Sequence, residues 1–340
     1  MIRSMSMRNF YKRNILSLHF KTNLPILSMP QNNAQQQVLI IKLGALGDFI
    51  QALGPMAAIR KHHPNAHITI LTTKPFEKLA ENSNYCDEIW LDERPKFFQW
   101  KKWRSLKNSL NTENFTRVYD LQNNDRTSFY FKLFKKPRPE WIGIAKGASH
   151  RNTSKERTKG QAFDGHAMTL GLAGINNIEI DPLLWMKADV SNFGLTDKYA
   201  LIVPGSAPQH PYKRWSSDRY TTICNELISK GVQPVLIGTE SESEITTAIH
   251  EECDGALNLT GKTSLEHIAV LARNAQLALG NDTGPMHIIA PTGCPSVILF
   301  SKHSNPVRHA PKGNRVKTLQ VDDMEDMSLG MVSMAIAEYL

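Results

Sequence analysis

Short runs of consecutive apolar residues recur along the chain from residue 38 onward, and each is followed by a polar turn. The first run, Val38-Leu-Ile-Ile-Lys42, has no polar alternation, which is typical of a parallel strand buried on both faces. Runs of the same kind predict strands over residues 67–71, 88–91, 117–121, 140–144, 182–185, 199–203, 233–237, 277–279, 296–300 and 316–321.

Amphipathic stretches separate these runs and predict the helices. Pro64 stops the first helix, 49–63, and Gly231 follows the helix over 218–230 as a C′ residue. Thr263-Ser-Leu-Glu266 reads as a capping box that opens a helix ending at Arg273. The other predicted helices lie near residues 77–81, 97–110, 129–134, 166–172, after 242, after 284 and over 328–340.

This alternation of strands and helices predicts an α/β protein whose parallel sheets are covered on both faces. The pattern stops at Ser191-Asn-Phe-Gly-Leu-Thr196 and restarts at Tyr199. We therefore expect two Rossmann-like doubly wound domains, 38–192 and 193–327, followed by a terminal helix, 328–340.

Residues 1–37 precede this pattern and show no periodicity. The first thirty residues are basic and contain no acidic residue, which superficially resembles an organelle transit peptide. The alternatives are a flexible tail, or an upstream start codon with Met29 nearer the true beginning. We favour a flexible basic tail.

The composition is that of a soluble globular protein, with 41% hydrophobic and 21% charged residues. No apolar run approaches the roughly 20 residues needed to span a bilayer. The four cysteines are far apart and form no C-x-x-C pair, so we expect a reducing cytosol, no disulfide framework and no zinc site.

The net charge of +8 is unevenly distributed. Residues 1–30 carry +5 and residues 96–160 carry +11, so the remainder carries −8. A basic segment of this kind suits an anionic partner such as a phosphorylated lipid, a membrane surface or nucleic acid.

One turn stands out as a candidate ligand site. The apolar run 277–279 leads through Gly280-Asn-Asp-Thr-Gly284 into Pro285, which suits the first turn of a helix. Asp282 or Thr283 can be the N-cap, and the free N–H groups of such a helix start attract a phosphate. On these residues alone, an anion site and an ordinary well-capped turn are equally good readings.

Ligands of doubly wound sheets bind at the carboxyl ends of the strands, which makes loops 44–48, 204–213 and 280–287 the candidates. The first loop, Gly44-Ala-Leu-Gly47, lacks the full G-x-G-x-x-G of a dinucleotide site, and no ribose-binding acid follows at the expected spacing. This argues against an NAD-type dehydrogenase.

Taken in order, several motifs resemble the ADP-heptose:lipopolysaccharide heptosyltransferases, family 9 of the glycosyltransferases. The resemblance covers about residues 38–340. It is carried by Ile41-Lys-Leu-Gly-Ala-Leu-Gly-Asp48, Asp120-Leu-Gln122, Lys213-Arg-Trp215, Leu259-Thr-Gly-Lys-Thr-Ser-Leu265, Gly280-Asn-Asp-Thr-Gly-Pro-Met-His287 and Leu299-Phe300.

The resemblance implies the GT-B architecture, in which two Rossmann-like domains face each other across a cleft and the last helix crosses back to the first domain. The acceptor would bind the N-terminal domain and the nucleotide-sugar the C-terminal domain. It implies an inverting, metal-independent transfer with Asp48 as general base, whereas the residues alone favour Asp48 as an N-cap.

The resemblance also assigns the donor side. Lys213 would face the diphosphate, with Arg214 as the competing cation, and Ser206 would add a hydrogen bond. Glu242, or Glu240 beside it, would hold the ribose, and Thr263 would line the adenine. The diphosphate cradle would consist of Asp282, Thr283, Gly284 and His287, although Asp282 is better suited to capping its own loop and a helix histidine is more often packed.

For the acceptor side we expect Gln122, Arg126 and Arg151. Arg151 belongs to a basic loop with Lys146, His150, Lys155, Arg157 and Lys159, which is equally well read as a solvated surface.

The expected substrates are an ADP-sugar and an anionic glycolipid, with no cofactor, no metal and no nucleic acid. We expect a cytoplasmic protein peripheral to the inner membrane. The alternatives are a family member with another donor, and a nucleotide-sugar-binding protein without turnover.

Overall fold

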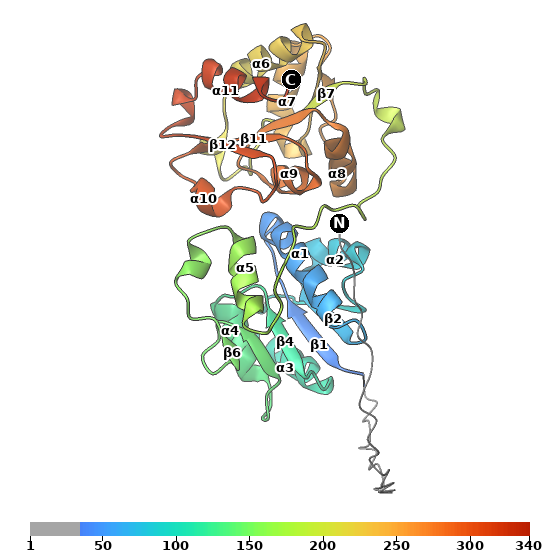
Figure 1. Cartoon of the computed structure of the whole chain (residues 1–340), viewed down its shortest axis with the longest axis vertical. Coiled ribbons are helices and arrows are strands. Elements are labelled where there is room, and N and C mark those ends of the chain that lie inside the picture. The colour runs from blue at the N-terminus through green and yellow to red at the C-terminus, as the bar shows by residue number, and fades with distance from the viewer. Residues whose placement is uncertain (1–34) are drawn as a thin grey trace, which may run out of the picture. The chain divides into compact units, whose positions relative to one another are not determined.

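The computed structural model describes residues 35–340, and its N-terminal half is built on a parallel sheet (Figure 1). Its strands are β1 (Gln37–Ile41), β2 (His67–Thr72), β3 (Glu88–Leu91), β4 (Arg117–Asp120), β5 (Glu140–Gly143) and β6 (His150–Arg151). Its helices are α1 (Leu46–His62), α2 (Glu77–Ser83), α3 (Trp100–Thr112), α4 (Asp125–Leu133) and α5 (Ala162–Gly171).

The C-terminal half repeats the arrangement. Its strands are β7 (Tyr199–Val203), β8 (Gln233–Leu236), β9 (Leu257–Asn258), β10 (Leu277–Asn281), β11 (Ser296–Ser301) and β12 (Val316–Val321). Its helices are α6 (Ser217–Ser229), α7 (Ser243–Glu251), α8 (Leu265–Asn274), α9 (Gly284–Ile289), α10 (Pro306–His309) and α11 (Leu329–Ala337).

Both sheets have the doubly wound strand order. The first runs β3-β2-β1-β4-β5-β6 and the second β12-β11-β10-β7-β8-β9, with all pairs parallel. The order reverses between β1 and β4, and again between β7 and β10. The expected α/β class with two Rossmann-like halves is confirmed.

The apolar runs fold into these strands because both faces of each sheet are covered. Along β1, Val38 and Ile40 belong to one hydrophobic cluster, while Leu39 and Ile41 belong to another on the opposite face. All four side chains are fully buried, so neither face of the strand can accommodate a polar residue.

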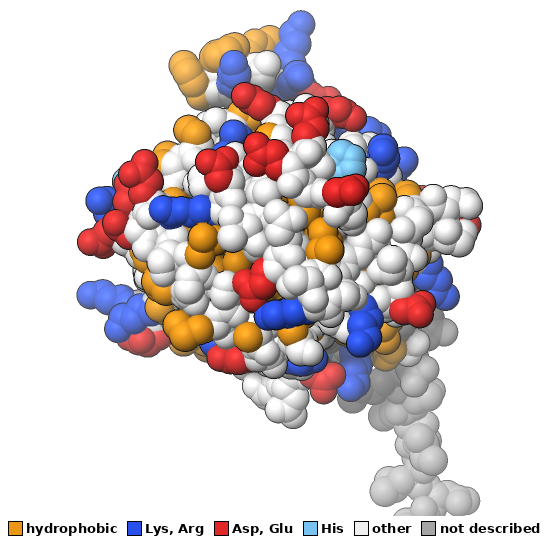
Figure 2. All heavy atoms as spheres, turned by 90° about the horizontal axis from the view of Figure 1, so that it is seen from above, with side chains coloured by type: hydrophobic (Ala, Val, Ile, Leu, Met, Phe, Trp, Pro, Cys, Tyr) orange, Lys and Arg blue, Asp and Glu red, His pale blue; other side chains and the backbone are white. Residues whose placement is uncertain are grey.

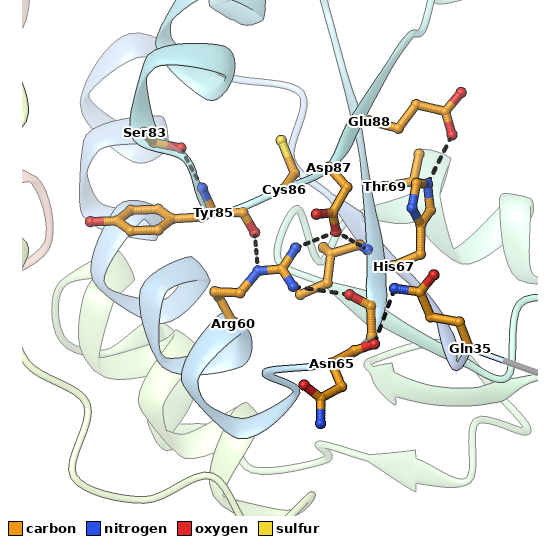
Figure 3. A network of polar contacts seen from close by, with 12 residues as sticks. Gln35, Arg60, Asn65, His67, Thr69, Ser83, Tyr85, Cys86, Asp87 and Glu88 are labelled. Carbon is orange, nitrogen blue, oxygen red and sulfur yellow. Dashed lines mark hydrogen bonds and ion pairs between the residues drawn. The ribbon is translucent and has the colours of Figure 1, made fainter. Parts of the chain in front are cut away.

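An arginine network fixes the end of α1 to the neighbouring strands (Figure 3). Arg60 donates hydrogen bonds to the carbonyls of Ala66, at 2.9 Å, and Tyr85, at 3.4 Å, and pairs with Asp87. Asp87 also accepts the N–H of Ile68 at 2.8 Å. The C-terminal end of α1 is thereby tied to β2 and to the segment before β3.

The predicted strand at 182–185 is wrong, because Asp181 shapes this segment as a turn. Its carboxylate accepts hydrogen bonds from the N–H of Leu183, at 2.8 Å, from Trp185 Nε1, at 3.0 Å, and from the Tyr85 hydroxyl, at 2.7 Å. Leu183 adopts φ +57°, which a strand cannot contain.

The position of the last helix differs from the expectation that it crosses back to the first domain. α11 packs against α6, β11 and β12 of the second half. Val332, Ala335 and Ile336 are buried in the cluster that those elements share, and Ser333 donates a hydrogen bond to Glu226 of α6 at 2.6 Å. The apolar face of this short helix is thus satisfied within its own domain.

Two further predictions concern the chain as a whole. The predicted tail, 1–37, lies outside the described residues except for 35–37, and β1 already begins at Gln37. Within 35–340, none of the helices has the length and apolar character required to cross a bilayer.

Candidate active site

The crevices of the two sheets lie at the carboxyl ends of the central strands, where successive connections leave in opposite directions. Loop 42–45 leaves β1 and loop 121–124 leaves β4. Loop 204–216 leaves β7, and residues 282–283 connect β10 to α9. These are the segments in which the sequence places its candidate residues.

Asp48 is the third residue of α1 and not its N-cap. The N-cap is Ala45, whose side chain cannot accept a hydrogen bond, and the helix begins at Leu46. The Asp48 side chain is exposed, and its carboxylate has no hydrogen-bond or ion-pair partner among residues 35–340. It is therefore free to accept a proton or hydrogen bond from a ligand.

One cavity of about 370 Å³ brings Asp48 together with the predicted donor side. Its walls come from the start of α1, from the loop after β7, from the turn into α9 and from the segment after β11. The lining residues are Ala45, Gly47, Asp48, Gln51, His210, Tyr212, Lys213, Asp282, His287, His303, Ser304, Arg308 and His309.

An ion pair between Lys213 and Asp282 lies in the wall of this cavity. Lys213 Nζ lies 2.6 Å from Asp282 Oδ2, and the Ser304 hydroxyl donates to the same oxygen at 2.6 Å. The side chain of Asp282 is 8% exposed and that of Lys213 is 20% exposed. Lys213 keeps two further N–H donors for a ligand, because an ammonium group has three.

This pair corrects the expectation that Asp282 caps its own loop. The N-cap of α9 is Thr283, as its position suggested, but its side chain makes no capping hydrogen bond. The Asp282 carboxylate instead holds Lys213 in the cavity and orients its ammonium group.

Arg214, the competing cation, points away from the cavity and braces the loop after β7. Its guanidinium donates to the Ser206 hydroxyl at 3.1 Å and to the Ser206 carbonyl at 2.9 Å. The Ser206 hydroxyl in turn donates to the carbonyl of His210 at 2.8 Å, which uses its single hydrogen. The structure thus places Lys213, and neither Arg214 nor Ser206, in the cavity.

Asn281, which sequence reasoning missed, joins the end of β10 to the loop after β7 and to α6. Its amide donates to the carbonyl of Pro204 at 2.6 Å and accepts from Tyr220, at 3.0 Å, and from the N–H of Trp215, at 3.3 Å. A buried asparagine at the last position of an apolar strand is the signal that could have found it.

The predicted cradle lies at the start of α9, a helix of only two turns. Gly284 lies close to α1, since a β-carbon there would be 3.2 Å from Leu46 Cδ2. His287 packs its ring against Gly47, and its Nδ1 is buried without a partner among the described residues. Burial lowers the pKa of His287 to about 4, so the ring is neutral at physiological pH.

The two candidate ribose acids face different loops. Glu242 is buried and accepts the N–H and hydroxyl of Thr239 at 2.8 and 2.9 Å, closing a capping box. Its other carboxylate oxygen lies against Gly205, where a β-carbon would be 1.8 Å away. Glu240 is exposed and faces Gly261 in the same way, at 1.9 Å. Glu242 is therefore the acid beside the loop after β7.

The cap of α8 is one residue later than predicted. Ser264 is the N-cap: its hydroxyl accepts the N–H of His267 at 3.2 Å, and His267 Nδ1 accepts the N–H of Ser264 at 3.0 Å. Thr263 is half-buried and has no part in this box.

A second cavity, of about 230 Å³, lies on the N-terminal side and is also lined by Asp48. Its other walls come from the ends of β1 and β4, from the loop before α5 and from α10. The remaining lining residues are Lys42, Leu121, Gln122, Asn123, Arg157, Thr158, Gly160, Ala162, Gly165, His166, Arg308 and His309.

Buried ionisable groups underlie this second cavity. Lys42 donates to the carbonyl of Leu121 at 3.3 Å, and burial lowers its pKa against the attraction of Asp48 and Asp120. Burial raises the pKa of Asp120 to about 6, although its Oδ1 accepts two backbone N–H bonds. Burial also lowers the pKa of His166 well below its usual value.

The sequence singled out neither Lys42 nor His166. Lys42 ends an otherwise apolar run, and a cation at the carboxyl end of a buried strand is a signal that could have found it. His166 was placed at the beginning of a helix, whereas α5 begins at Ala162 and buries His166 in its middle.

Only one of the three predicted acceptor residues reaches this cavity. Gln122 lines it, with its side-chain oxygen accepting the N–H of Leu43 at 2.8 Å. Arg126 instead donates to the carbonyl of Pro95, at 3.3 Å, and stacks over Trp103. Arg151 is exposed and donates to the carbonyl of Ile144 at 3.1 Å. Of the predicted basic loop, Arg157 is the residue at the cavity.

Within residues 35–340 no group of three or more His, Cys, Asp or Glu side chains is arranged to hold a metal ion. The Lys and Arg side chains that line the cavity with Asp282 and His287 are Lys213 and Arg308.

Comparison with known proteins finds similar heptosyltransferases. Residues 176–334 match the sequence profile of glycosyltransferase family 9 (heptosyltransferase). The chain is 24% identical over 294 residues to lipopolysaccharide core heptosyltransferase OpsX of Haemophilus influenzae, and the alignment covers 83% of each chain. It is 31% identical over 156 residues to lipopolysaccharide heptosyltransferase 2 of Salmonella typhimurium, which covers 41% of this chain and 44% of that protein.

Solved structures share the fold. A family 9 glycosyl transferase from Veillonella parvula superposes with a TM-score of 0.75 at 21% identity, covering 89% of this chain and 97% of that one. ADP-heptose lipopolysaccharide heptosyltransferase II of E. coli gives 0.66 at 20% identity, covering 89% and 98%. These structures confirm the GT-B fold. The profile match and the curated relatives confirm the predicted resemblance and the expectation of a glycosyltransferase.

Proposed function

We propose that this glycosyltransferase, similar to the family 9 enzymes, moves a heptose from ADP-heptose to a lipopolysaccharide core acceptor with inversion at the anomeric carbon. The names of the relatives support the donor and acceptor classes. The observation that carries the mechanism is the position of Asp48, which lines both cavities.

The two cavities divide the substrates. We assign the nucleotide-sugar to the cavity that contains Lys213 and His287, and the acceptor to the cavity that contains Lys42 and Gln122. An acceptor hydroxyl at the junction would lie beside Asp48, whose unpaired carboxylate would take its proton as the oxygen attacks the anomeric carbon.

Lys213 would stabilise the departing diphosphate. Negative charge builds on the diphosphate as its bond to the anomeric carbon breaks, and an oriented ammonium group lowers the energy of that transition state. Asp282 and Ser304 would hold Lys213 in place, and the start of α9 would offer N–H groups to the same phosphates. Glu242 would accept hydrogen bonds from the ribose hydroxyls, and Thr263 would line the adenine.

We further propose that the reaction needs no metal ion, because Lys213 supplies the cation that the diphosphate requires. The enzyme would act at the cytoplasmic face of the inner membrane, where its lipid-anchored acceptor is found. Transfer should therefore be unchanged by EDTA, and strong inhibition would contradict the metal-free mechanism. A family member that uses another nucleotide-sugar is the nearest alternative.

A transfer assay with Asp48→Asn tests the assignment of the base. The substitution keeps the size of the side chain and removes its basicity, so the rate should fall by about 100-fold or more while ADP affinity stays near that of the wild type. Asp125→Asn is the matched control, because Asp125 is an acid in the first turn of α4 that lines neither cavity. If Asp48→Asn instead abolished ADP binding, Asp48 would be a donor ligand and not the base.

A thermal-shift panel tests the donor. ADP should raise the unfolding temperature more than UDP or GDP, because binding to the native state alone stabilises it. An NAD-selective shift would overturn the proposed function. A shift with ADP-heptose and no turnover of any acceptor would support the binding protein without activity.

A further inference from the structure

Three aromatic side chains project into solvent at the beginning of α3. Phe97 is 91% exposed, Phe98 is 61% exposed and Trp100 is 63% exposed. Large apolar side chains exposed side by side carry a free-energy cost in water, and such patches mark an interaction surface. We call residues 96–100 the aromatic turn.

The turn is held in this conformation by its own hydrogen bonds. The N–H of Gln99 donates to the carbonyl of Lys96 at 2.9 Å, and the Gln99 side chain accepts the N–H of Lys96 at 2.8 Å. Trp103 Nε1 donates to the same carbonyl at 3.0 Å. These hydrogen bonds hold the backbone in a conformation that leaves Phe97 and Phe98 exposed to solvent.

Helix α3 is anchored along one side only. Trp103 stacks edge-on against Phe129 and Tyr130, at 5.2 and 6.0 Å between ring centroids, and Leu110 is fully buried. The other side of the helix is exposed and carries Lys101, Arg104 and Lys107 among its residues. The aromatic turn and this outer face form one continuous stretch of the chain.

The charge of this stretch is entirely positive. Residues 96–110 contain five Lys or Arg and no Asp or Glu. Among the described residues, Lys102 is the member paired with an acid, Glu93, at 2.6 Å. By contrast, acidic and basic side chains are intermixed across the face shown in Figure 2.

The aromatic turn is connected directly to the loop that leads into α1, the helix that carries Asp48. Arg94, two residues before the turn, donates to the carbonyl of Leu43 at 2.6 Å. Arg126 donates to the carbonyl of Pro95 at 3.3 Å. The turn thus follows the carboxyl end of β3, and the acceptor cavity lies at the carboxyl ends of β1 and β4 in the same sheet.

We propose that the aromatic turn and the outer face of α3 bind an anionic phospholipid bilayer. Aromatic side chains partition into the headgroup region, and exposed Lys and Arg are attracted to anionic lipids. The choice of a bilayer over single-stranded nucleic acid, which also favours aromatic and basic surfaces, rests on the proposed lipid-linked acceptor. A bilayer bound here would bring that acceptor close to the carboxyl ends of the strands, where Asp48 lines the acceptor cavity.

Vesicle flotation with the full chain tests this surface. The probes are phosphatidylcholine vesicles with and without about 30% phosphatidylglycerol, at low and high salt. The wild type should float with the anionic vesicles only, and high salt should weaken this binding. Phe97→Ser/Phe98→Ser/Trp100→Ser should weaken it about tenfold or more, and Lys101→Gln/Arg104→Gln/Lys107→Gln should abolish the preference for anionic lipid.

Leu184→Ser/Met334→Ser is the matched control, because these side chains are 64% and 70% exposed elsewhere on the chain. It should float like the wild type. Equal flotation of the aromatic variant would overturn the proposal, as would wild-type binding to oligothymidylate without binding to vesicles. Circular dichroism of each variant shows whether it is folded.

A second measurement separates this proposal from the proposed function. The aromatic variant should transfer sugar normally to a deacylated, water-soluble acceptor and slowly to the same acceptor embedded in vesicles. Equal loss with both acceptors would contradict the docking role. A wild type that floats with vesicles but transfers no sugar would contradict the proposed function and leave the surface standing.

Discussion

Gly47, the second residue of α1, lies directly against the imidazole ring of His287. A β-carbon on Gly47 would be 2.7 Å from Cδ2 and 2.8 Å from Nε2 of that ring, closer than such atoms approach in proteins. The contact joins the helix that carries Asp48 to the helix that carries the predicted diphosphate cradle. It therefore fixes the distance between the two halves of the candidate site.

Replacing Gly47 with alanine should disturb this contact. The methyl group must displace the ring or separate the helices, which costs about 1–3 kcal/mol and exceeds the roughly 1 kcal/mol that alanine adds to helix propensity. We expect a lower free energy of unfolding in urea and a lower transfer rate. Gly330→Ala is the matched control, since Gly330 is the second residue of α11 and its added carbon would meet no atom within 4 Å. Gly47→Ala/His287→Ala should recover part of the lost stability, and equal losses with and without the ring would contradict a steric cause.

The pair of Lys213 and Asp282 predicts a non-additive double mutant. Lys213→Ala leaves the poorly exposed Asp282 carboxylate with Ser304 as its remaining partner, and loss of the cationic partner in that position costs about 1–3 kcal/mol. Adding Asp282→Asn removes that charge, so the double variant should be more stable to urea than Lys213→Ala alone. Transfer should remain slow in both variants, because neither has the cation. Additive losses of stability would show that the two side chains are not coupled.

Most of the fold could be predicted from the sequence because its strands are buried on both faces. Every side chain of a run such as 199–203 is buried, and a short apolar run without polar alternation is typical of a strand in the middle of a parallel sheet. Short elements with little apolar content, such as β6 and β9, carry too few residues to give a pattern. The segment at 182–185 has apolar residues but is shaped by Asp181, a side-chain contact that periodicity does not contain.

The candidate site was predictable where a motif has a specific pattern. The turn after β10 stands out as polar residues between an apolar strand and a helix start, whereas Lys213 is assigned by the family resemblance. The structure brings both into one cavity with Asp48. Arg126 is predicted from its place after a strand end and Arg151 from the charge of its loop, and neither feature gives the direction of a long side chain. Each donates a hydrogen bond to a backbone carbonyl and does not line the acceptor cavity.

The one-residue shift in the cap of α8 leads to a direct test. Ser264→Ala removes the hydroxyl that accepts the N–H of His267, so it should lower the free energy of unfolding by about 1 kcal/mol. Thr263→Ala removes the neighbouring hydroxyl, which is not part of the box, and should have a smaller effect on stability. Thermal unfolding of both variants checks this. A larger loss of stability for Thr263→Ala would instead support Thr263 as the cap of α8.

The raised pKa of Asp120 predicts how stability depends on pH. Burial raises this pKa from 3.8 to about 6, so the folded state holds the proton more tightly than the unfolded chain. The stabilisation from this proton is fully present below about pH 3.8 and is lost as the pH rises through about 6. At pH 8 the buried ionised carboxylate should cost about 3 kcal/mol relative to its protonated form.

Asp120→Asn stays neutral at every pH, and its side-chain oxygen can still accept the N–H groups of Gln122 and Asn123. We therefore expect the variant to be more stable than the wild type at pH 8, by about 1–3 kcal/mol. The difference should shrink between pH 6 and pH 4, as measured by urea unfolding at each pH. Asp125→Asn controls for removal of a charge, because Asp125 is exposed at the start of α4. A difference that is constant from pH 4 to pH 8 would mean that the Asp120 carboxylate is not the group that titrates.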